Sequence, residues 1–270
     1  MRNLVLLAVA SSLGACTSTF NEPRLLVSPY LASYRLGGDV ALQSQPGQGA
    51  VQDNTAQPTR AFGLDRYDTD IGVRADFGDG FAGLRFDYYR LDHETSKSSV
   101  LDGDWGALTT GDEVRMRAAM DEFRLGWLEP LFTARTSYRD QPLKVQMAAG
   151  VVLAHRDLDL RAGTTDGTKT QNVDLGGDVA YAAMRMRATW RTVGVELDYA
   201  ISPGLVLGGD FEDVQHDLEV RGTYNVPLYD VTFFAGYRWS QLQAEGDAGA
   251  LGYEADLVID GFQFGASLVF

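Results

Sequence analysis

The sequence predicts an all-β chain folded as an antiparallel, up-and-down transmembrane β-barrel of about ten strands, with eight or twelve strands as alternatives. Three observations support this fold. Apolar and polar residues alternate with period two after residue 67, tight turns contrast with long loops, and the last strand, "GFQFGASLVF", alternates up to Phe270. Alternation alone does not identify the inner face, so a soluble sandwich or lipocalin-like barrel is the alternative.

The first residues read as an export signal and not as part of the fold. The apolar run at residues 4–13 follows Arg2 and is too short for a membrane-spanning helix. Leu13-Gly14-Ala15-Cys16 resembles the lipobox of bacterial lipoproteins, in which the cysteine becomes the lipidated first residue of the mature chain. An ordinary signal peptide with a chance cysteine is the alternative.

This resemblance implies a domain organisation of three parts. Residues 1–15 would be the signal peptide, residues 16–23 a lipidated linker, and residues 24–270 a single outer-membrane barrel domain. Thr17 resembles lipoproteins of the outer membrane, since an aspartate at this position retains the protein in the inner membrane. Acylation of Cys16 would use the only cysteine, so no thiol is expected for disulfides, metal binding or catalysis.

The clearest strands form a hairpin around Gly78-Asp79-Gly80. Before this turn Ile71, Val73 and Phe77 share one face, while charged residues occupy the other. A weaker pattern predicts a first strand at 24–36, and similar alternation predicts strands at 123–127, 145–153, 180–190, 195–201, 218–226, 231–239 and 262–270. Residues 113–123 are ambiguous between helix and strand, because their phase slips near Met120.

The connections between these strands differ in length. Those after the second, sixth and eighth strands are tight, whereas those after the first, third and fifth run to roughly 30, 21 and 17 residues. Short turns on one rim and long loops on the other are typical of a transmembrane barrel. The segment 130–142 fits neither a strand nor a short turn, so we expect a periplasmic excursion there or a strand count that is wrong by two.

Aromatic residues and the last residue support a membrane location. Aromatics at the predicted strand ends are expected at the two membrane interfaces, and they are Trp127, Trp190, Tyr199, Tyr224, Tyr237 and Trp239. The closing strand on Phe270 resembles the C-terminal signature that the bacterial barrel-assembly machinery recognises. This resemblance implies that machinery as a partner during biogenesis.

If the apolar faces contact lipid, the opposite faces line the lumen. These faces hold eight basic residues, Arg74, Arg85, Arg124, Lys144, Arg185, Arg187, Arg221 and Arg238, and eight acidic ones, Asp70, Asp76, Asp87, Glu122, Glu196, Asp198, Asp217 and Glu219. A ring of about ten strands leaves little more room than its side chains need. Paired charges should therefore fill the lumen, which favours a plug over a general porin and leaves a narrow solute channel as an alternative.

The acidic surplus falls in the predicted long loops. The net charge of −14 argues against nucleic acid as a partner. The loop acids are Asp92, Glu94, Asp102, Asp104, Asp112, Asp157, Asp159, Asp166, Asp174, Asp178, Asp210, Glu212 and Asp213. They would be solvated or share divalent cations with lipopolysaccharide. The spacing of a calcium-binding loop is missing, and we expect no cofactor and no metal site.

Three histidines are the candidates for catalysis. We expect His93 to be solvated in a loop, and His216 to point away from Asp217. His155 shares a strand face with Asp157 and Asp159, near the outer rim. Ten strands with such a pair resemble the omptins, outer-membrane proteases that use an aspartate pair and a histidine–aspartate pair, although the "HRD" order here is reversed.

The sequence therefore predicts a Gram-negative outer-membrane protein that is lipid-anchored and membrane-spanning, with both termini in the periplasm. We expect a non-enzymatic, structural or surface-interaction role, with outer-membrane lipid and lipopolysaccharide as contacts. The alternatives are a narrow solute channel and a rim hydrolase that uses His155 and Asp157.

Overall fold

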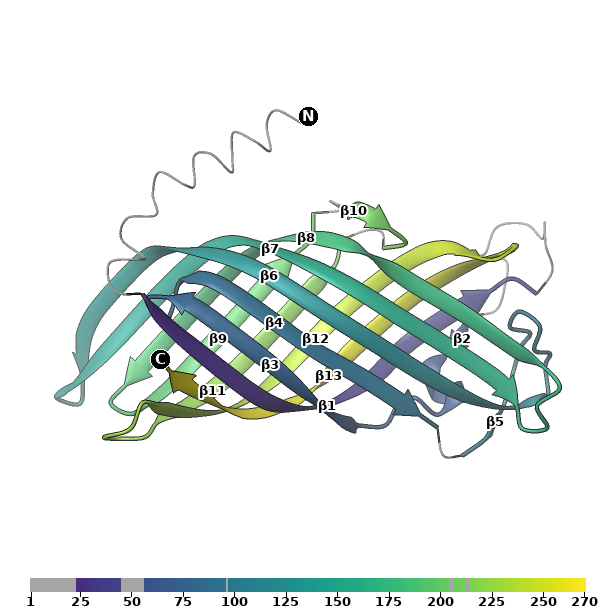
Figure 1. Cartoon of the computed structure of the whole chain (residues 1–270), viewed down its shortest axis with the longest axis horizontal. Coiled ribbons are helices and arrows are strands. Elements are labelled where there is room, and N and C mark those ends of the chain that lie inside the picture. Colours follow the sequence, from purple (N-terminus) through teal and green to yellow (C-terminus); the bar gives the residue numbers. More distant parts are fainter. Residues whose placement is uncertain (1–22, 45–55, 96, 204–205, 212–213) are drawn as a thin grey trace, which may run out of the picture.

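Ten long antiparallel strands form one closed ring (Figure 1). The computed structural model describes residues 23–44, 56–95, 97–203, 206–211 and 214–270. Its ring strands are β1 (Arg24–Leu42), β3 (Asp68–Gly78), β4 (Gly83–Glu94), β6 (Glu113–Tyr138), β7 (Gln141–Thr164), β8 (Thr170–Trp190), β9 (Val193–Ile201), β11 (His216–Asn225), β12 (Val231–Ala248) and β13 (Leu251–Val269). Because β1 pairs with β13, the ring closes, and the predicted antiparallel barrel of about ten strands is confirmed.

Short elements decorate one end of this ring. They are β2 (Gln57–Pro58), the 3₁₀ turn η2 (Thr59–Phe62), β5 (Ser99–Val100) and β10 (Val206–Gly209). The β2 strand pairs with β1, β5 pairs with β6, and β10 pairs with β8 beyond the end of β9. Within the described ranges, the chain contains no helix with the length and hydrophobicity of a membrane-crossing helix.

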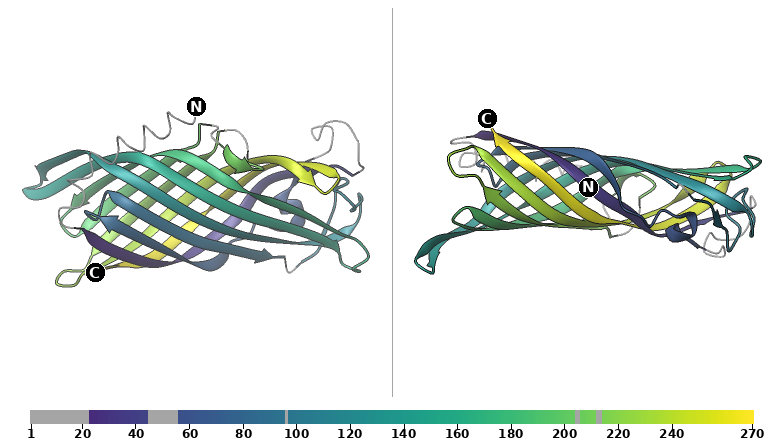
Figure 2. Two further views of the ribbon diagram at one scale, coloured as in Figure 1. Left: turned by 45° about the horizontal axis from the view of Figure 1, so that its top comes forward. Right: turned by 90° about the horizontal axis from the view of Figure 1, so that it is seen from below.

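The two ends of the barrel differ in their connections, and the views of Figure 2 show the same arrangement from other sides. At the turn end, residues 79–82, 139–140, 191–192 and 226–230 link successive strands. Both β1 and β13 also reach this end, where Leu25 and Phe270 exchange backbone hydrogen bonds. The opposite loop end carries the longer connections, residues 43–67, 95–112 and 202–215.

The two faces of each long strand exchange polarity along its length, and β13 shows this clearly. Toward the turn end, Phe262 and Phe264 are exposed on the outer face and Gln263 is buried inside. Toward the loop end, Leu257 is buried inside while Asp256 is exposed outside. The barrel thus has an apolar exterior with a polar interior in its turn half, and a polar exterior with an apolar interior in its loop half.

This inversion explains the ambiguous segment at 113–123. Val114 and Met120 are buried on the inner face of β6, in phase with Glu122. The strand therefore keeps its period of two, and only the polarity of its two faces is exchanged near Met120. The phase slip expected from the sequence was wrong. It came from the assumption that polar residues always mark the inner face.

Residues 130–142 belong to two strands. The β6 strand continues to Tyr138, a two-residue turn at Arg139 and Asp140 with φ of 52° and 59° reverses the chain, and β7 begins at Gln141. A β-bulge lies between Pro130 and Phe132. Because β4 stops pairing with β6 at Leu128, this hairpin projects past the turn end, and the ring keeps ten strands.

One predicted long loop is wrong as well. Residues 154–164 and 170–179 continue β7 and β8, so their connection is only residues 165–169. The prediction failed because, in the loop half, these strands carry their charged residues on the outer face and their apolar residues on the inner face. Asp157, Asp159, Asp174 and Asp178 therefore lie on strands and not in a loop.

Candidate functional site: the luminal charge network

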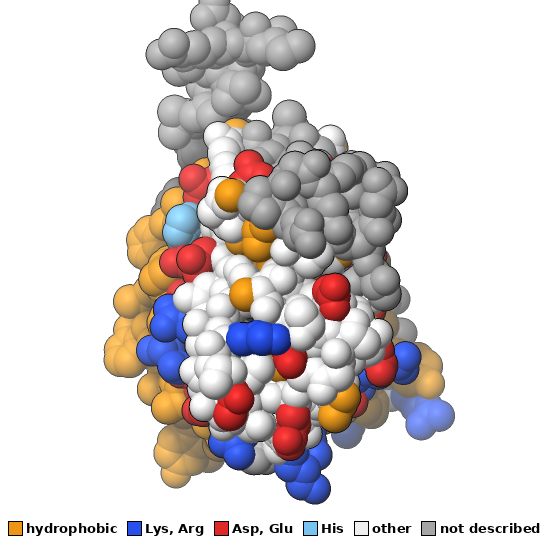
Figure 3. All heavy atoms as spheres, turned by 90° about the vertical axis from the view of Figure 1, so that its right-hand side faces the viewer, with side chains coloured by type: hydrophobic (Ala, Val, Ile, Leu, Met, Phe, Trp, Pro, Cys, Tyr) orange, Lys and Arg blue, Asp and Glu red, His pale blue; other side chains and the backbone are white. Residues whose placement is uncertain are grey.

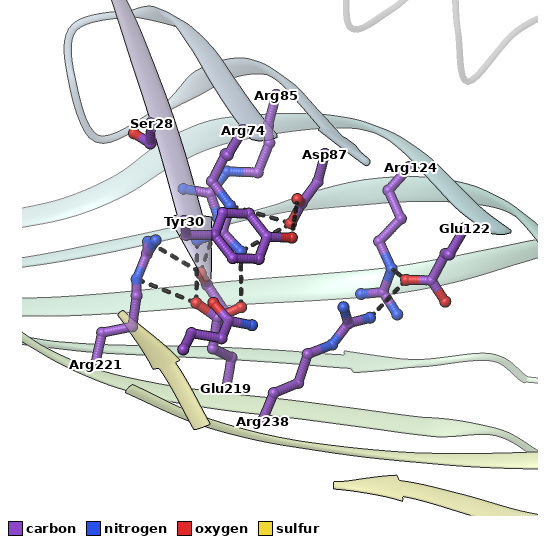
Figure 4. A network of polar contacts seen from close by, with 12 residues as sticks. Ser28, Tyr30, Arg74, Arg85, Asp87, Glu122, Arg124, Glu219, Arg221 and Arg238 are labelled. Carbon is purple, nitrogen blue, oxygen red and sulfur yellow. Dashed lines mark hydrogen bonds and ion pairs between the residues drawn. The ribbon is translucent and has the colours of Figure 1, made fainter. Parts of the chain in front are cut away.

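The interior of the turn half holds a network of arginines and carboxylates (Figure 4). The strand period sends every second side chain inward, and in this half the inward positions are charged. Figure 4 shows these side chains reaching into the lumen from opposite walls. Ion pairs divide them into two clusters, named below by their central carboxylates.

The Glu196 cluster lies nearer the turn end and contains equal numbers of basic and acidic groups. Its members are Arg74, Arg85, Arg185, Arg187 and Arg221 with Asp76, Asp87, Glu196, Asp198 and Glu219. Arg85 donates to Asp76 at 2.6 Å and to Asp198 at 2.8 Å. Shared partners of this kind allow charges to be buried, because each ion keeps close counter-charges and hydrogen bonds.

Arg74 is the member that crosses the lumen most completely. It is 1 % exposed, and its guanidinium donates to Asp87 at 2.8 Å on the neighbouring strand and to Glu219 at 2.8 Å on the opposite wall. Tyr30 donates its hydroxyl to the same Asp87 carboxylate at 2.8 Å. Four strands are thereby tied together at this level.

The turn between β3 and β4 folds into the mouth of the barrel and binds this cluster. Arg185 donates to the carbonyl of Phe81 at 2.8 Å, and Arg187 donates to that of Gly80 at 2.7 Å. The Phe81 side chain is buried, and the Arg187 guanidinium lies 5.0 Å from the centre of its ring. The turn end is thus partly covered by the chain itself.

The Glu122 cluster lies one layer further toward the loop end. It contains Glu122 and Asp217 with Arg124, Arg156 and Arg238. Glu122 accepts from all three arginines, including Arg238 at 2.6 Å, and Asp217 accepts from Arg124 at 2.6 Å. Three guanidiniums therefore share two carboxylates.

Sequence reasoning missed part of this network. Arg156 was not among the predicted lumen charges, although it follows His155 and so faces the opposite side. The buried tyrosines, Tyr30, Tyr34, Tyr89 and Tyr181, were missed because alternation groups them with apolar residues. Lys144 and Asp70, which were predicted to face the lumen, have no ion-pair partner within the described ranges.

Above the charges, an apolar core fills the loop half of the barrel. Trp105 and Phe62, from the two long connections, are fully buried with ring centres 5.4 Å apart. Leu64 and Leu108 from the same connections join inward-facing strand residues in one cluster. Figure 3 views the loop end, where backbone and uncharged side chains predominate among the described residues, with scattered acidic, basic and hydrophobic groups.

Described residues line three cavities at different levels of the barrel. One of about 240 Å³ lies at the turn end, lined by Ser28, Arg85, Arg187 and Arg221 among others. A second of about 60 Å³ lies deeper, beside Arg124. A third, of about 360 Å³, lies at the loop end between Arg60, Asp68 and His93.

The three histidines lie apart from one another. His155 is exposed on the outer wall, where its partner is Asp178 of β8 at 2.9 Å and not Asp157 as predicted. His216 accepts or donates a hydrogen bond with Tyr199 at 2.8 Å. His93 is buried, and not solvated as predicted, with Nδ1 3.8 Å from Asp68.

The acidic groups at the loop end are ordered by hydrogen bonds. Lys169 from the β7–β8 turn donates to Asp112 at 2.7 Å, and this bond together with those from Thr109 holds the pKa of Asp112 below its usual value. Thr110 binds Asp104 and lowers the pKa of that carboxyl likewise. Glu212 and Asp213 lie outside the described residues.

The described residues contain no group of three or more histidine, cysteine or acidic side chains that could hold a metal ion. Cys16, the predicted lipidation site, lies outside the described residues, as do the predicted signal peptide and most of the linker. Phe270 is 74 % exposed at the turn end, and its backbone pairs with Leu25.

Comparison with known proteins identifies the fold. The chain is similar to the outer membrane protease OmpT from Escherichia coli, with a TM-score of 0.50 and 10 % identity over 92 % of this chain and 97 % of that one. The chain has the fold of an outer-membrane β-barrel. A Pseudomonas aeruginosa FadL homologue aligns over 93 % of this chain and 90 % of its own, with 9 % identity and a TM-score of 0.27. The TodX monoaromatic hydrocarbon channel deltaS2 mutant has 12 % sequence identity and a TM-score of 0.27, over 95 % of this chain and 93 % of its own. No protein-family model and no curated protein sequence matches.

Proposed function

We propose that this chain is a bacterial outer-membrane β-barrel lipoprotein with a structural or surface-interaction role and no catalytic activity. The observation that carries this proposal is the filled lumen. Arginine–carboxylate pairs cross it at the level of Arg74 and Glu122, and the apolar core around Trp105 occupies the half beyond them. A solute would have to break both layers to pass.

The outer surface supports a membrane location for the turn half. Leu31, Ile71, Val151, Val195 and Phe264 lie on different strands and are all exposed, as a band in contact with hydrocarbon requires. Outer-membrane lipid would surround this band, and lipopolysaccharide would contact the polar wall above it. The exposed Phe270, which directly follows β13, supports recognition by the barrel-assembly machinery.

The arrangement of histidines supports a non-enzymatic role. The His155 imidazole lies on the outer wall with more than half of its surface exposed, and Asp178 is its hydrogen-bonded partner. General-base catalysis requires the substrate to be held beside the imidazole. A convex strand surface offers no such enclosure for a rim hydrolase.

Conductance across planar bilayers tests the filled lumen. The refolded protein, inserted beside a general porin as a positive control, should give no unitary current steps. Reproducible steps would replace the proposed role with the narrow solute channel.

A labelling experiment tests the anchor. Cells that express the full chain should incorporate labelled palmitate into it, and Cys16→Ser should abolish this incorporation. Both forms should migrate faster on gels before heating than after it, as folded barrels do. Label retained by Cys16→Ser would refute lipidation at this residue.

A further inference from the structure

The Glu122 cluster carries one positive charge more than its carboxylates neutralise. Arg124, Arg156 and Arg238 face only Glu122 and Asp217, whereas the Glu196 cluster pairs five arginines with five carboxylates. Among the described residues, no ion pair joins the two clusters within 4.0 Å. The excess charge is therefore local to the Glu122 cluster.

This excess cannot be removed by losing a proton, and water reaches only the Arg124 side chain, which is 12 % exposed. Arginine stays protonated in proteins. Arg156 and Glu122 are 0 % exposed and Arg238 is 1 % exposed. A buried charge without a counter-charge is strongly destabilising, so the cluster needs one negative charge that the described residues do not supply.

The hydrogen bonds show which of the two fully buried arginines, Arg156 and Arg238, has a terminal nitrogen without a partner. Arg156 Nη1 donates to Tyr181 and Gln215, and Arg156 Nη2 donates to Ser240, so these groups are occupied. Arg238 uses Nε and Nη2 on the two carboxylates. Its Nη1 is buried and has no hydrogen-bond partner among the described residues.

The side chain that packs against this guanidinium carries a second unused donor. The Arg238 Cζ atom lies 4.8 Å from the ring centre of Tyr89, and the buried Tyr89 hydroxyl also has no partner in the described part of the chain. Gln263 is 0 % exposed and lies on β13, the strand next to that of Arg238. Its Oε1 has no hydrogen-bond partner among the described residues. Its Nε2 donates to the Tyr34 hydroxyl, and exchanging the two ends of the amide would let Oε1 accept from that hydroxyl and free the NH₂ group for another acceptor.

We propose that the Glu122 cluster binds a small monovalent anion of the halide class, such as chloride, between Arg238 Nη1 and the Tyr89 hydroxyl. The anion accepts hydrogen bonds from these two donors and balances the third guanidinium. It acts as a structural counter-ion inside the barrel, and this holds whether or not the barrel conducts.

Thermal unfolding of the refolded protein in detergent tests this proposal. At constant ionic strength, replacing sodium gluconate by sodium chloride should raise the unfolding midpoint progressively, because a ligand that binds only the folded state stabilises it by mass action. Equal midpoints in the two salts would overturn the proposal.

Two matched variants assign the effect to the cluster. Arg238→Gln removes the excess charge and the Nη1 donor, so its midpoint should no longer respond to chloride. Arg74→Gln removes an equally buried arginine from the balanced Glu196 cluster, and its lower midpoint should still rise with chloride. A response that persists in Arg238→Gln, or is lost in Arg74→Gln, would refute the assignment.

Crystallography provides a readout that does not depend on a variant folding. Crystals of the wild-type protein soaked in sodium bromide should give an anomalous peak within hydrogen-bond distance of Arg238 Nη1. Peaks confined to the protein surface would contradict the proposal.

The milder Tyr89→Phe variant should retain the fold and weaken the chloride response.

Discussion

Arg238 on β12 donates to Glu122 on β6 across the lumen at 2.6 Å, although the two residues are 116 positions apart in the sequence. Glu122 is also the acceptor for Arg124 and Arg156. Its carboxylate is therefore the centre on which three strands of opposite walls converge, and its loss would leave three guanidiniums with one carboxylate.

Glu122→Gln should lower the free energy of unfolding by about 3–5 kcal/mol, the range found when one partner of a buried ion pair is removed. Urea-induced unfolding in detergent or lipid vesicles measures this change. Glu254→Gln, which alters an exposed carboxylate on β13, should stay within about 0.5 kcal/mol of wild type. Similar losses in both variants would show that the network does not stabilise the barrel.

Gly72→Ala should disturb the same network from the backbone. A Cβ atom at residue 72 would lie 2.2 Å from Cζ of the Tyr30 ring, which must then move away from Asp87. We expect a loss of about 1–3 kcal/mol, as for other overpacked interiors. The matched variant Gly222→Ala, whose Cβ meets no atom nearer than 3.9 Å, should cost much less. Equal stabilities would mean that the Tyr30 ring is not held in place.

Asp174→Asn should stabilise the loop half at neutral pH. Partial desolvation and the directly opposite Asp159 raise the pKa of Asp174, although this residue is exposed. The folded state therefore holds this proton more tightly than the unfolded state, so the cost is absent at low pH and appears as the pH rises through the folded pKa. Relief of such a like-charge pair is worth about a few tenths of a kcal/mol.

Comparing unfolding curves of wild type and Asp174→Asn across pH measures this cost. The two curves should converge in acid and separate toward neutral pH, with the variant the more stable. A variant that is less stable than wild type at neutral pH would show that Asp174 makes a favourable contact.

The two turn-end hairpins should respond oppositely to shortening. Replacing residues 137–142 by Asn-Gly keeps the Thr136–Leu143 pair and removes mostly exposed chain, with the Tyr138–Trp190 ring contact as the main loss, so gel mobility of the folded form and the unfolding midpoint should be nearly retained. The same replacement at residues 79–82 removes Phe81 and the carbonyls that bind Arg185 and Arg187. That variant should unfold more readily, and equal tolerance would mean that this turn does not support the cluster.

Much of the barrel could be predicted because alternation has a strict period. The strands near Phe77, Phe86 and Phe264 keep apolar residues outside and charged residues inside, so their inner faces were identified by charge. The ion pairs of Arg74 with Asp87 and Glu219 follow from the same parity, although their distances across the lumen require the closed ring.

The loop half could not be predicted in this way, because the inward-facing positions of the same strands are apolar there and the outward-facing positions are polar. Met120 and Glu122 share the inner face, and so do Leu158 and Arg156, yet each pair mixes apolar with charged residues. A rule that assigns faces by polarity then sees a break in the strand. Ends of strands and lengths of loops were misjudged for this reason, whereas the parity itself would have assigned Arg156 correctly.

The extension of β7 and β8 beyond the apolar band has a consequence for how this surface meets its surroundings. Asp157 and Asp159 repeat on one strand at about 6.6 Å, the two-residue spacing of a pleated strand. Asp174 and Asp178 face the same way on the next strand. A flexible loop must lose conformational entropy before its charges match a partner. The backbone instead fixes the spacing of these four carboxylates in advance, and Asp159 and Asp178 already pair with Arg161 and His155.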